Sequence, residues 1–183
     1  MHTPKMTVLQ DTTNNQPERR TSYTCIIFYR WYTQDGKNRG RVMARMVAKA
    51  LEALDVTVWL DQQQMSKQAT REQVIAGIHK AFQRVQYVII LAAPGDWDRF
   101  VNEDDIHRWE WEMSLKSRKP VWVLQYETIC PRLDLQTNLV RELLLFSNFL
   151  ADLVLKRSIE VRSLTTENFY DVLEEITKGP CTT

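Results

Sequence analysis

Two glutamates, Glu110 and Glu112, lie in a predicted helix within residues 104–124, and their spacing is the strongest indication of chemistry in the chain. Glu112 has Lys116 four residues further on, the favourable orientation for a solvated ion pair. Glu110 instead shares its side of the helix with Ile106, where a carboxylate must be paired or must line a cleft, because burying it alone is costly. Glu110 is therefore the candidate for a functional group in a cleft. The alternative is that it lies at the helix boundary and simply reaches water.

The flanking residues predict how this helix begins and ends. Asp104 or Asp105 can cap it, because a carboxylate accepts hydrogen bonds from the free N–H groups of the first turn. Lys119 and Pro120 follow the helical stretch. The apolar run Val121–Leu124 comes next and is typical of a strand in a parallel sheet that is covered on both faces. The helix is therefore expected to lead into a buried strand.

Apolar runs rich in β-formers alternate along the chain with helical patterns. The predicted strands cover residues 23–29, 56–60, 87–92, 121–124 and 158–162, and the predicted helices cover 38–54, 70–84, about three turns after 105, 135–155 and 165–178. This alternation predicts an α/β fold: a flavodoxin-like, doubly wound, five-stranded parallel sheet with helices on both faces. Residues 1–21 are expected to form a disordered or extended N-terminal arm, 22–179 the domain and 180–183 a tail.

The polar residues from Gln62 to about Thr70 are expected to form a loop, and Thr70 is expected to cap the helix that follows.

Two of the predicted helices carry specific expectations about burial. In the helix over 38–54, the large residues Val42 and Met46 begin an apolar stripe that is expected to face the core. The segment 135–155 has an excess of apolar residues, which predicts a long helix that docks on the sheet. The alternative is that its apolar face binds a partner.

Composition bounds the classes of partner. Lys and Arg number 24 against 23 Asp and Glu, so the net charge of +1 gives no global attraction to nucleic acid or to an anionic membrane. The three cysteines, Cys25, Cys130 and Cys181, are too widely spaced for a disulfide framework or a zinc site. We find neither an apolar stretch of signal-peptide type nor one of membrane-spanning length. A soluble cytoplasmic protein is expected.

The ends of the first two predicted strands are the other candidate positions for a site. The first strand ends in Tyr29, Arg30 and Trp31, and the second closes on Asp61. In open parallel sheets, ligands bind at the carboxyl ends of the strands. We therefore expect a ligand to bind near the turn that holds Arg30 and Trp31.

Several chemistries common in α/β proteins are absent. No glycine-rich phosphate loop follows the first strand, and neither a Walker lysine nor a nucleophile elbow is present. The chain has three histidines, at positions 2, 79 and 107, which argues against a histidine-based triad or metal site, and His79 has no Cys or acid at ligand spacing, so we expect no metal. A response-regulator receiver has the same strand order, but its acidic pair and its lysine are missing.

The segment 110–124, EWEMSLKSRKPVWVL, is similar to a pattern of the Toll/interleukin-1 receptor (TIR) domain family. That pattern is a Glu, an apolar residue, two residues, a small residue, Leu, three residues, Lys-Pro and an apolar strand, and it aligns without a gap. Residues 26–30, 58–61 and 88–95 also resemble the first three strands of the family. In this register Glu110 matches the catalytic glutamate of the family, whereas Glu112 would need a gap of two residues.

The resemblance implies that the protein cleaves NAD+ between nicotinamide and ribose. The products would be nicotinamide and ADP-ribose or a cyclic relative, often a defence or cell-death signal, with NAD+ as substrate and without a cofactor. Nicotinamide leaves as a neutral base, so one carboxylate that stabilises the oxocarbenium-like transition state is sufficient. The residues implied to contact NAD+ are Tyr29, Arg30, Trp31, Asp61 and Trp109, with Arg30 near the pyrophosphate and the aromatic rings stacked on the bases.

Other family members act only as scaffolds that assemble with further TIR domains. The resemblance places the assembly surface in the loop after the second strand, with Met65, Ser66 and Thr70, so self-association or binding to other TIR domains is the alternative function. A third hypothesis is a sensor that binds a nucleotide without turning it over. The chain departs from the family at Phe28, where Ser is usual, and at Ile106, where Trp is usual.

Overall fold

The computed structural model describes residues 23–32, 36–66, 68–126, 134–157 and 159–179. The predicted arm over 1–21 and the predicted tail over 180–183 lie outside the described residues, as do Cys130 and Cys181. The structure and chemistry below concern the described parts of the chain.

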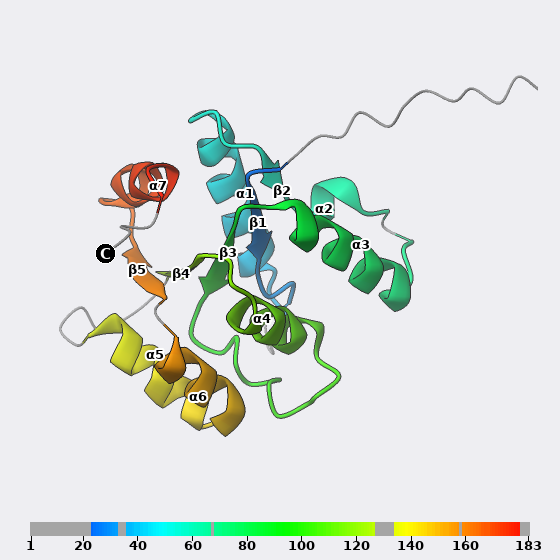
Figure 1. The fold of residues 1–183 in the computed structure, drawn as a ribbon, viewed down its shortest axis with the longest axis vertical. Coiled ribbons are helices and arrows are strands. Elements are labelled where there is room, and N and C mark those ends of the chain that lie inside the picture. Colours follow the sequence, from blue (N-terminus) through cyan, green and yellow to red (C-terminus); the bar gives the residue numbers. More distant parts are fainter. Residues whose placement is uncertain (1–22, 33–35, 67, 127–133, 158, 180–183) are drawn as a thin grey trace, which may run out of the picture.

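The described strands form one parallel sheet, as the alternating pattern predicts. Its strands are β1 (Cys25–Phe28), β2 (Val58–Trp59), β3 (Tyr87–Ala92), β4 (Val121–Tyr126) and β5 (Glu160–Leu164). They lie side by side in the order β2-β1-β3-β4-β5, and every pairing is parallel (Figure 1). This is the flavodoxin-like order, so the predicted fold class is confirmed.

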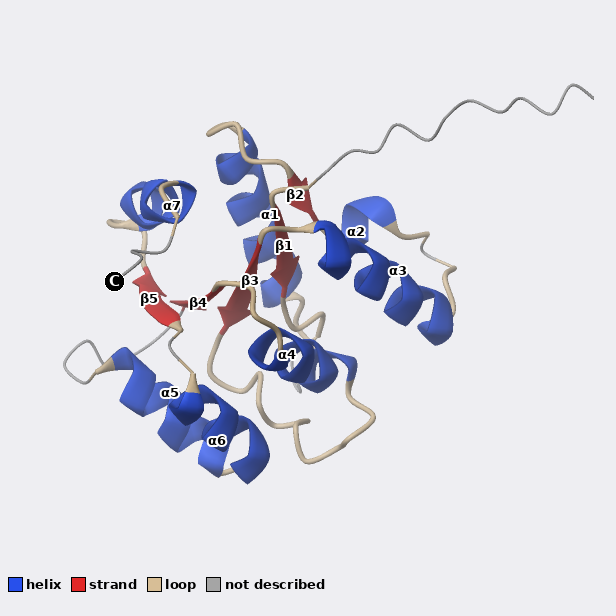
Figure 2. Ribbon diagram, in the orientation of Figure 1, coloured by secondary structure: helices blue, strands red, loops and turns tan. Residues whose placement is uncertain are grey.

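Helices cover both faces of the sheet, and Figure 2 separates them by colour from the strands. The helices α1 (Arg39–Glu52) and α7 (Phe169–Thr177) pack on one face. The helices α3 (Arg71–Arg84), α4 (Ile106–Lys116), α5 (Leu135–Leu144) and α6 (Asn148–Lys156) pack on the other, and the short α2 (Asp61–Gln64) follows β2. The helix α4 is thus placed against the sheet between α3 and the α5–α6 pair.

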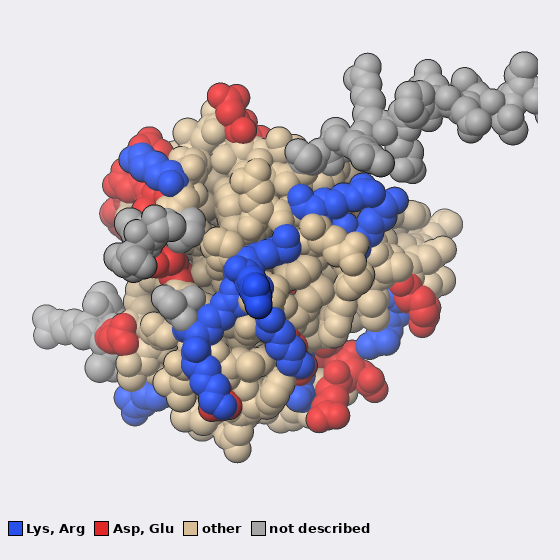
Figure 3. All heavy atoms as spheres, in the orientation of Figure 1, with Lys and Arg blue, Asp and Glu red and all other residues tan. Residues whose placement is uncertain are grey.

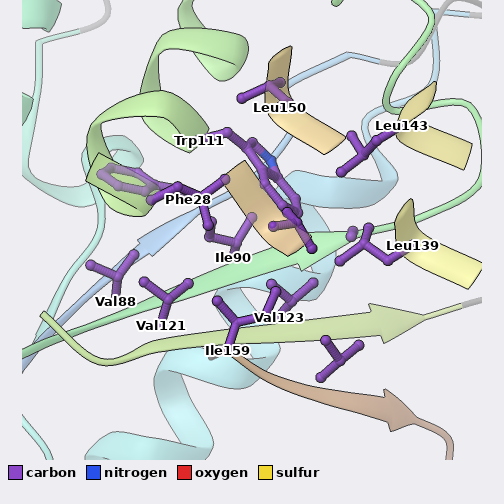
Figure 4. Packing of buried hydrophobic residues seen from close by; sticks show 14 of the residues in the cluster. Phe28, Val88, Ile90, Trp111, Val121, Val123, Leu139, Leu143, Leu150 and Ile159 are labelled. Atoms are coloured by element: carbon purple, nitrogen blue, oxygen red, sulfur yellow. The ribbon is translucent and has the colours of Figure 1, made fainter. Parts of the chain in front are cut away.

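Alternate residues of each strand enter two separate cores, because successive side chains of a strand point to opposite faces. Ile26, Phe28 and Ile90 join the core under α3 to α6, whereas Ile27 and Ile89 join the core under α1 and α7. Figure 4 shows Trp111 of α4 and the leucines of α5 and α6 facing the strand residues of the first core. All six residues of β3 and of β4 are buried, which explains their continuous apolar runs.

The predicted apolar stripe of α1 is wrong at its first two positions, although Leu51 further along the helix is buried as expected. Val42 and Met46 are 42% and 51% exposed, and the buried side instead carries small residues such as Gly40 and Ala44. A Cβ added at Gly40 would lie 2.2 Å from the carbonyl oxygen of Arg30. The close approach of α1 to the end of β1 therefore selects small residues over large ones.

Two segments also differ from the predicted secondary structure, one expected as a single helix and one expected as a loop. The segment expected as one helix over 135–155 is two helices, α5 and α6, because Ser147 caps α6 by accepting a hydrogen bond from the amide of Leu150. The polar residues after β2 were expected as loop, but Asp61–Gln64 forms the single turn α2. The predicted Thr70 cap of α3 is confirmed, with Gln73 completing a capping box.

None of the helices in the described ranges combines the length and the apolar content that a membrane crossing needs.

Charged side chains are unevenly distributed over the surface, although the net charge is close to zero. On the face seen in Figure 3, Lys and Arg side chains gather across the centre, while Asp and Glu lie mostly toward the edges.

Candidate functional site

A cavity of about 340 Å³ opens where β1 and β2 end and where α3 and α4 approach them. In the observed strand order, β1 lies between β2 and β3, and the connections leaving β1 and β3 go to opposite faces of the sheet. Ligands of open α/β sheets bind in the crevice at such a point. Five of the predicted site residues line this cavity, namely Tyr29, Arg30, Trp31, Asp61 and Glu110.

Glu110 is a buried carboxyl group on the wall of the cavity. Its side chain is only 7% exposed, and its Oε2 lies 2.8 Å from Nδ1 of His107, one helical turn earlier on α4. Burial, reinforced by the negative charge of Asp61, raises the pKa of Glu110 well above its ordinary value, and Arg30 opposes this shift only in part. Glu110 therefore lines a cleft, one of the two outcomes that the sequence left open.

The partner of Glu110 is His107. Burial and the nearby charge of Arg30 lower the pKa of His107 well below its ordinary value. The pKa shifts of His107 and Glu110 each favour the uncharged form of the group, so the contact has the character of a hydrogen bond more than of an ion pair.

Asp61 is a second carboxylate in the cavity and is held by three donors. The Tyr29 hydroxyl and the Gln62 amide donate to Oδ1 at 2.5 and 2.6 Å, and the Trp31 indole donates to Oδ2 at 2.5 Å. Burial raises the pKa of Asp61, while these hydrogen bonds and Arg41 pull it back. We regard Asp61 as the ionised member of the pair, because two of its three partners, an indole and an amide, are donors only.

Arg30 lines the cavity, but its guanidinium is committed to the protein. Nη1 donates to Asp105 Oδ2 at 2.6 Å, and Nε and Nη2 donate to the carbonyl oxygen of Asp96 at 3.1 and 2.7 Å. The side chain is 6% exposed and lies over the ring of Phe100. Arg30 thus ties the end of β1 to the start of α4, and its expected contact with a pyrophosphate stays a prediction.

Other cationic and aromatic side chains surround the mouth of the cavity. Arg71 and Arg99 belong to the lining, and the side chain of Arg99 is 61% exposed. Trp31 and Tyr32 are 38% and 48% exposed, and the guanidinium of Arg41 lies over both rings. These residues can meet a ligand that enters from solvent, whereas Tyr29 is buried and its hydroxyl is engaged by Asp61.

Trp109 does not line the cavity. It is half-buried and packs against the core under α3 to α6, so its position lends no support to the expected contact with NAD+, which stays a prediction. Adjacent positions on a helix point about 100° apart, which turns Trp109 away from the side that carries Glu110. Glu112 behaves as predicted: its Oε2 lies 3.2 Å from Nζ of Lys116.

The three predicted assembly residues have local structural roles. Met65 packs against the core, and its sulfur lies 2.7 Å from where a Cβ of Gly77 would stand. Ser66 is exposed and accepts a hydrogen bond from the amide of Gln68, and Thr70 caps α3. Assembly through this surface stays a prediction.

Three site residues were missed by the sequence reasoning. Only His107 had a usable signal in the sequence, because it stands three residues before Glu110 and therefore on the same side of the helix. Arg71 and Arg99 carried no such signal, because α3 and the loop after β3 come together at the cavity only in the folded chain.

In the described part of the chain, no three His, Cys, Asp or Glu side chains gather closely enough to hold a metal ion. The arrangement offers two buried carboxyl groups, Glu110 and Asp61, both with a raised pKa, and a rim of arginine and aromatic side chains. In comparisons with known proteins, no protein-family model and no curated protein sequence matches this chain.

Proposed function

We propose that the protein is a TIR-type NAD+ glycohydrolase or cyclase in which Glu110 is the catalytic residue. The bond cleaved joins nicotinamide to ribose, and the products are nicotinamide and ADP-ribose or a cyclic relative. Such a product suits a defence or cell-death signal in the cytoplasm. NAD+ is the substrate, and the reaction as proposed uses no cofactor.

The single observation that carries the proposal is the position of Glu110: buried, in contact with His107 at 2.8 Å and on the wall of a cavity at the carboxyl ends of β1 and β2. Such a combination of burial, a shifted pKa and a cavity is typical of functional sites. The register of the resemblance at residues 110–124 selects the same glutamate independently.

The charge layout of the cavity supports NAD+ as the ligand. The buried acids Glu110 and Asp61 lie inside, whereas Arg99 and Arg71 stand at the exposed rim. NAD+ carries a positive nicotinamide ring and a negative diphosphate. Nicotinamide directed inward and diphosphate at the rim would match each charge with its opposite. Trp31 and Tyr32 at the mouth offer faces on which a base can stack.

A buried glutamate with a raised pKa must lose its proton before it can stabilise a cation. The positive nicotinamide ring beside Glu110 favours the ionised form, so binding of NAD+ is expected to release a proton. The carboxylate then orients the ribose hydroxyls and stabilises the oxocarbenium-like transition state as nicotinamide departs with the bonding electrons. Water, or a nitrogen of the adenine in a cyclase, adds to the ribose carbon and gives up a proton.

The test is incubation of the concentrated protein with NAD+, followed by chromatography of nicotinamide. We expect Glu110→Gln to lower kcat by about 10²- to 10³-fold, the range for loss of one preorganised electrostatic group. The matched control Glu112→Gln, two residues away on the same helix, is expected to stay within about twofold of the wild type. Absence of nicotinamide from the wild type, or equal turnover by Glu110→Gln, would contradict the proposal.

A scaffold function is the second candidate, and the surface of α5 and α6 favours it. Leu145, Phe149 and Leu155 are 76%, 43% and 63% exposed on these neighbouring helices. Exposed apolar groups of this kind mark protein contacts. This function predicts assembly that increases with concentration in sedimentation experiments, with no loss of NAD+. A nucleotide sensor would instead show a thermal shift with ADP-ribose and no turnover.

A further inference from the structure

Three buried side chains of α4 are linked in series. The indole Nε1 of Trp111 donates to Nε2 of His107 at 3.3 Å, and Nδ1 of His107 lies 2.8 Å from Oε2 of Glu110. Trp111, His107 and Glu110 are 0%, 4% and 5% exposed. The chain of contacts runs from the hydrophobic core to the wall of the cavity.

The first contact determines where the proton of His107 lies. An indole N–H can only donate, so Nε2 of the imidazole must accept. A neutral imidazole with an accepting Nε2 carries its proton on Nδ1. His107 therefore donates from Nδ1 to Oε2 of Glu110, and Oε1 is the carboxyl oxygen left for a ligand.

Aromatic packing holds this arrangement. The ring of His107 lies 5.7 Å from Phe100 and 6.5 Å from Trp111, and Trp111 stands edge-on to Trp97 at 5.4 Å. Figure 4 shows Trp111 among the apolar side chains that join α4 to the sheet and to α6. A ring flip of His107 would leave the indole N–H without its acceptor in a dry site, which is costly.

The charged groups around the pair act in known directions. Arg30, from the end of β1, lowers the pKa of His107 and of Glu110, whereas Asp61 after β2 and Asp105 at the start of α4 raise the pKa of Glu110. Tyr29 lines the same cavity, and the charge of Glu110 contributes to raising the pKa of its hydroxyl. His107 contributes a donor to this balance without contributing a charge.

We propose that His107, held by Trp111 as the Nδ1–H tautomer, is a positioning residue that aims Glu110 and leaves its Oε1 for the ribose hydroxyls of NAD+. This inference rests on the proposed function. When Glu110 ionises during the reaction, the hydrogen bond from His107 becomes charge-assisted and stabilises the carboxylate. No proton passes through His107.

The first test reads the tautomer directly and needs no activity. Long-range proton–nitrogen NMR correlation on protein with ¹⁵N-labelled histidine distinguishes a protonated from an unprotonated ring nitrogen, and the His107→Phe variant assigns the signal by its loss. If His107→Phe does not fold, His107→Asn serves for the assignment. We expect a protonated Nδ1 and an unprotonated Nε2 at neutral pH. An Nε2–H tautomer or an imidazolium would overturn the inference. In Trp111→Phe we expect the Nε2 signal to shift, and an unchanged signal would remove Trp111 from the proposal.

The second test measures the pH profile of kcat/KM, which reports the pKa of the free enzyme. His107→Phe is expected to lower kcat/KM about 10- to 100-fold at neutral pH, the cost of one hydrogen bond to a charged group. The same variant should move the rising limb to higher pH, because the carboxylate has lost a donor. His107→Asn can place its amide nitrogen near the position of Nδ1 and should restore both.

The matched control is His79→Phe, an exposed histidine of α3, which should change neither quantity. An unshifted profile in His107→Phe, or a loss in His107→Asn equal to that in His107→Phe, would overturn the positioning role. If the wild type does not cleave NAD+, the proposed function fails, and the NMR result still decides the tautomer on its own.

Discussion

The two sides of α4 place a glutamate in opposite environments. On the cavity side, Glu110 is buried and receives a hydrogen bond within a cluster of His107, Asp61 and Arg30. On the solvent side, Glu112 forms ion pairs with Arg108 and Lys116, both at 3.2 Å. Environment therefore decides the chemistry of a glutamate: desolvation changes the proton affinity of the first, whereas water screens the charge of the second.

The difference extends to the arginines. On the cavity side, Arg30 is buried and all three of its nitrogens donate to protein oxygens. At the opposite end of α4, Arg157 donates to the carbonyl oxygens of Ser114 and Leu115 at 2.7 and 2.8 Å, and so caps the helix. The first arginine neutralises a buried acid beside a cavity, and the second satisfies backbone groups at a closed end.

The largest expected effect tests whether the cavity side depends on its buried charge pair. Arg30→Met is expected to lower the free energy of unfolding by about 3–5 kcal/mol, because Asp105 would remain buried with the Arg108 amide and with Arg99 at 3.7 Å. Denaturant unfolding followed by circular dichroism measures this loss. The solvent-side control Lys116→Met should cost less than about 1 kcal/mol. Equal losses would remove the distinction between the two sides.

A second prediction concerns the wall of the cavity at the end of β1. Gly40→Ala should lower the free energy of unfolding by about 1–3 kcal/mol, because the new Cβ meets the carbonyl of Arg30 and overpacking outweighs the gain of about 1 kcal/mol in helix propensity. Gly77→Ala on α3 is the matched control, since its Cβ meets only the flexible Met65 side chain. Thermal unfolding of both variants should show a clear loss for the first and a much smaller change for the second.

The pH dependence of stability sharpens the contrast between the glutamates. The pKa of Glu110 is raised in the folded state, so above its ordinary value of 4.5 the unfolded chain releases a proton that the folded protein keeps. Stability from this group is therefore full below pH 4.5 and falls by about 1.4 kcal/mol per pH unit until the raised pKa is reached. Glu110→Gln removes this slope, so the variant should become progressively more stable than the wild type as the pH rises.

Urea unfolding of the wild type and of Glu110→Gln across a series of pH values checks this prediction. The difference between the two proteins isolates Glu110, because the opposite slope from His107, whose pKa is lowered, is common to both. A constant difference across the series would show that the pKa of Glu110 is the same in the folded and unfolded states, and would contradict its assignment as a desolvated acid.

The smallest expected effect is on the solvent side. Glu112→Gln loses two ion pairs of the i,i+4 type, each contributing about 0.3–0.5 kcal/mol, and should lower the free energy of unfolding by about 0.6–1 kcal/mol. The loss should shrink in high salt, which screens exposed charges. A loss of several kcal/mol would place Glu112 in the same class as Glu110.

Local patterns predicted the elements and part of the site. The apolar runs marked β3 and β4, and the capping residues Asp105 and Thr70 marked the starts of α4 and α3. Helical spacing was also sufficient to separate Glu110 from Glu112, because a helix places i and i+4 neighbours on one side whatever surrounds it.

Partners that are distant in sequence could not be predicted in this way. Arg30 and Asp105 are 75 positions apart, and no local pattern pairs them. The same holds for Arg71 and Arg99 at the cavity rim, and for the small-residue side of α1, where the approach of a backbone carbonyl decides which residues fit. Trp109 shows the converse, because a residue adjacent to Glu110 in sequence points away from the cavity.

The sequence by itself determined the alternating α/β fold and distinguished Glu110 from Glu112, since periodicity and helix spacing are local properties of the chain. Only the tertiary structure decided that the guanidinium of Arg30 donates to Asp105 and to the carbonyl oxygen of Asp96. It also decided that a neutral His107 lies between Trp111 and Glu110. The physical reason is desolvation: the protonation and the hydrogen bonds of a polar group depend on which groups replace its water, and folding alone assembles that neighbourhood.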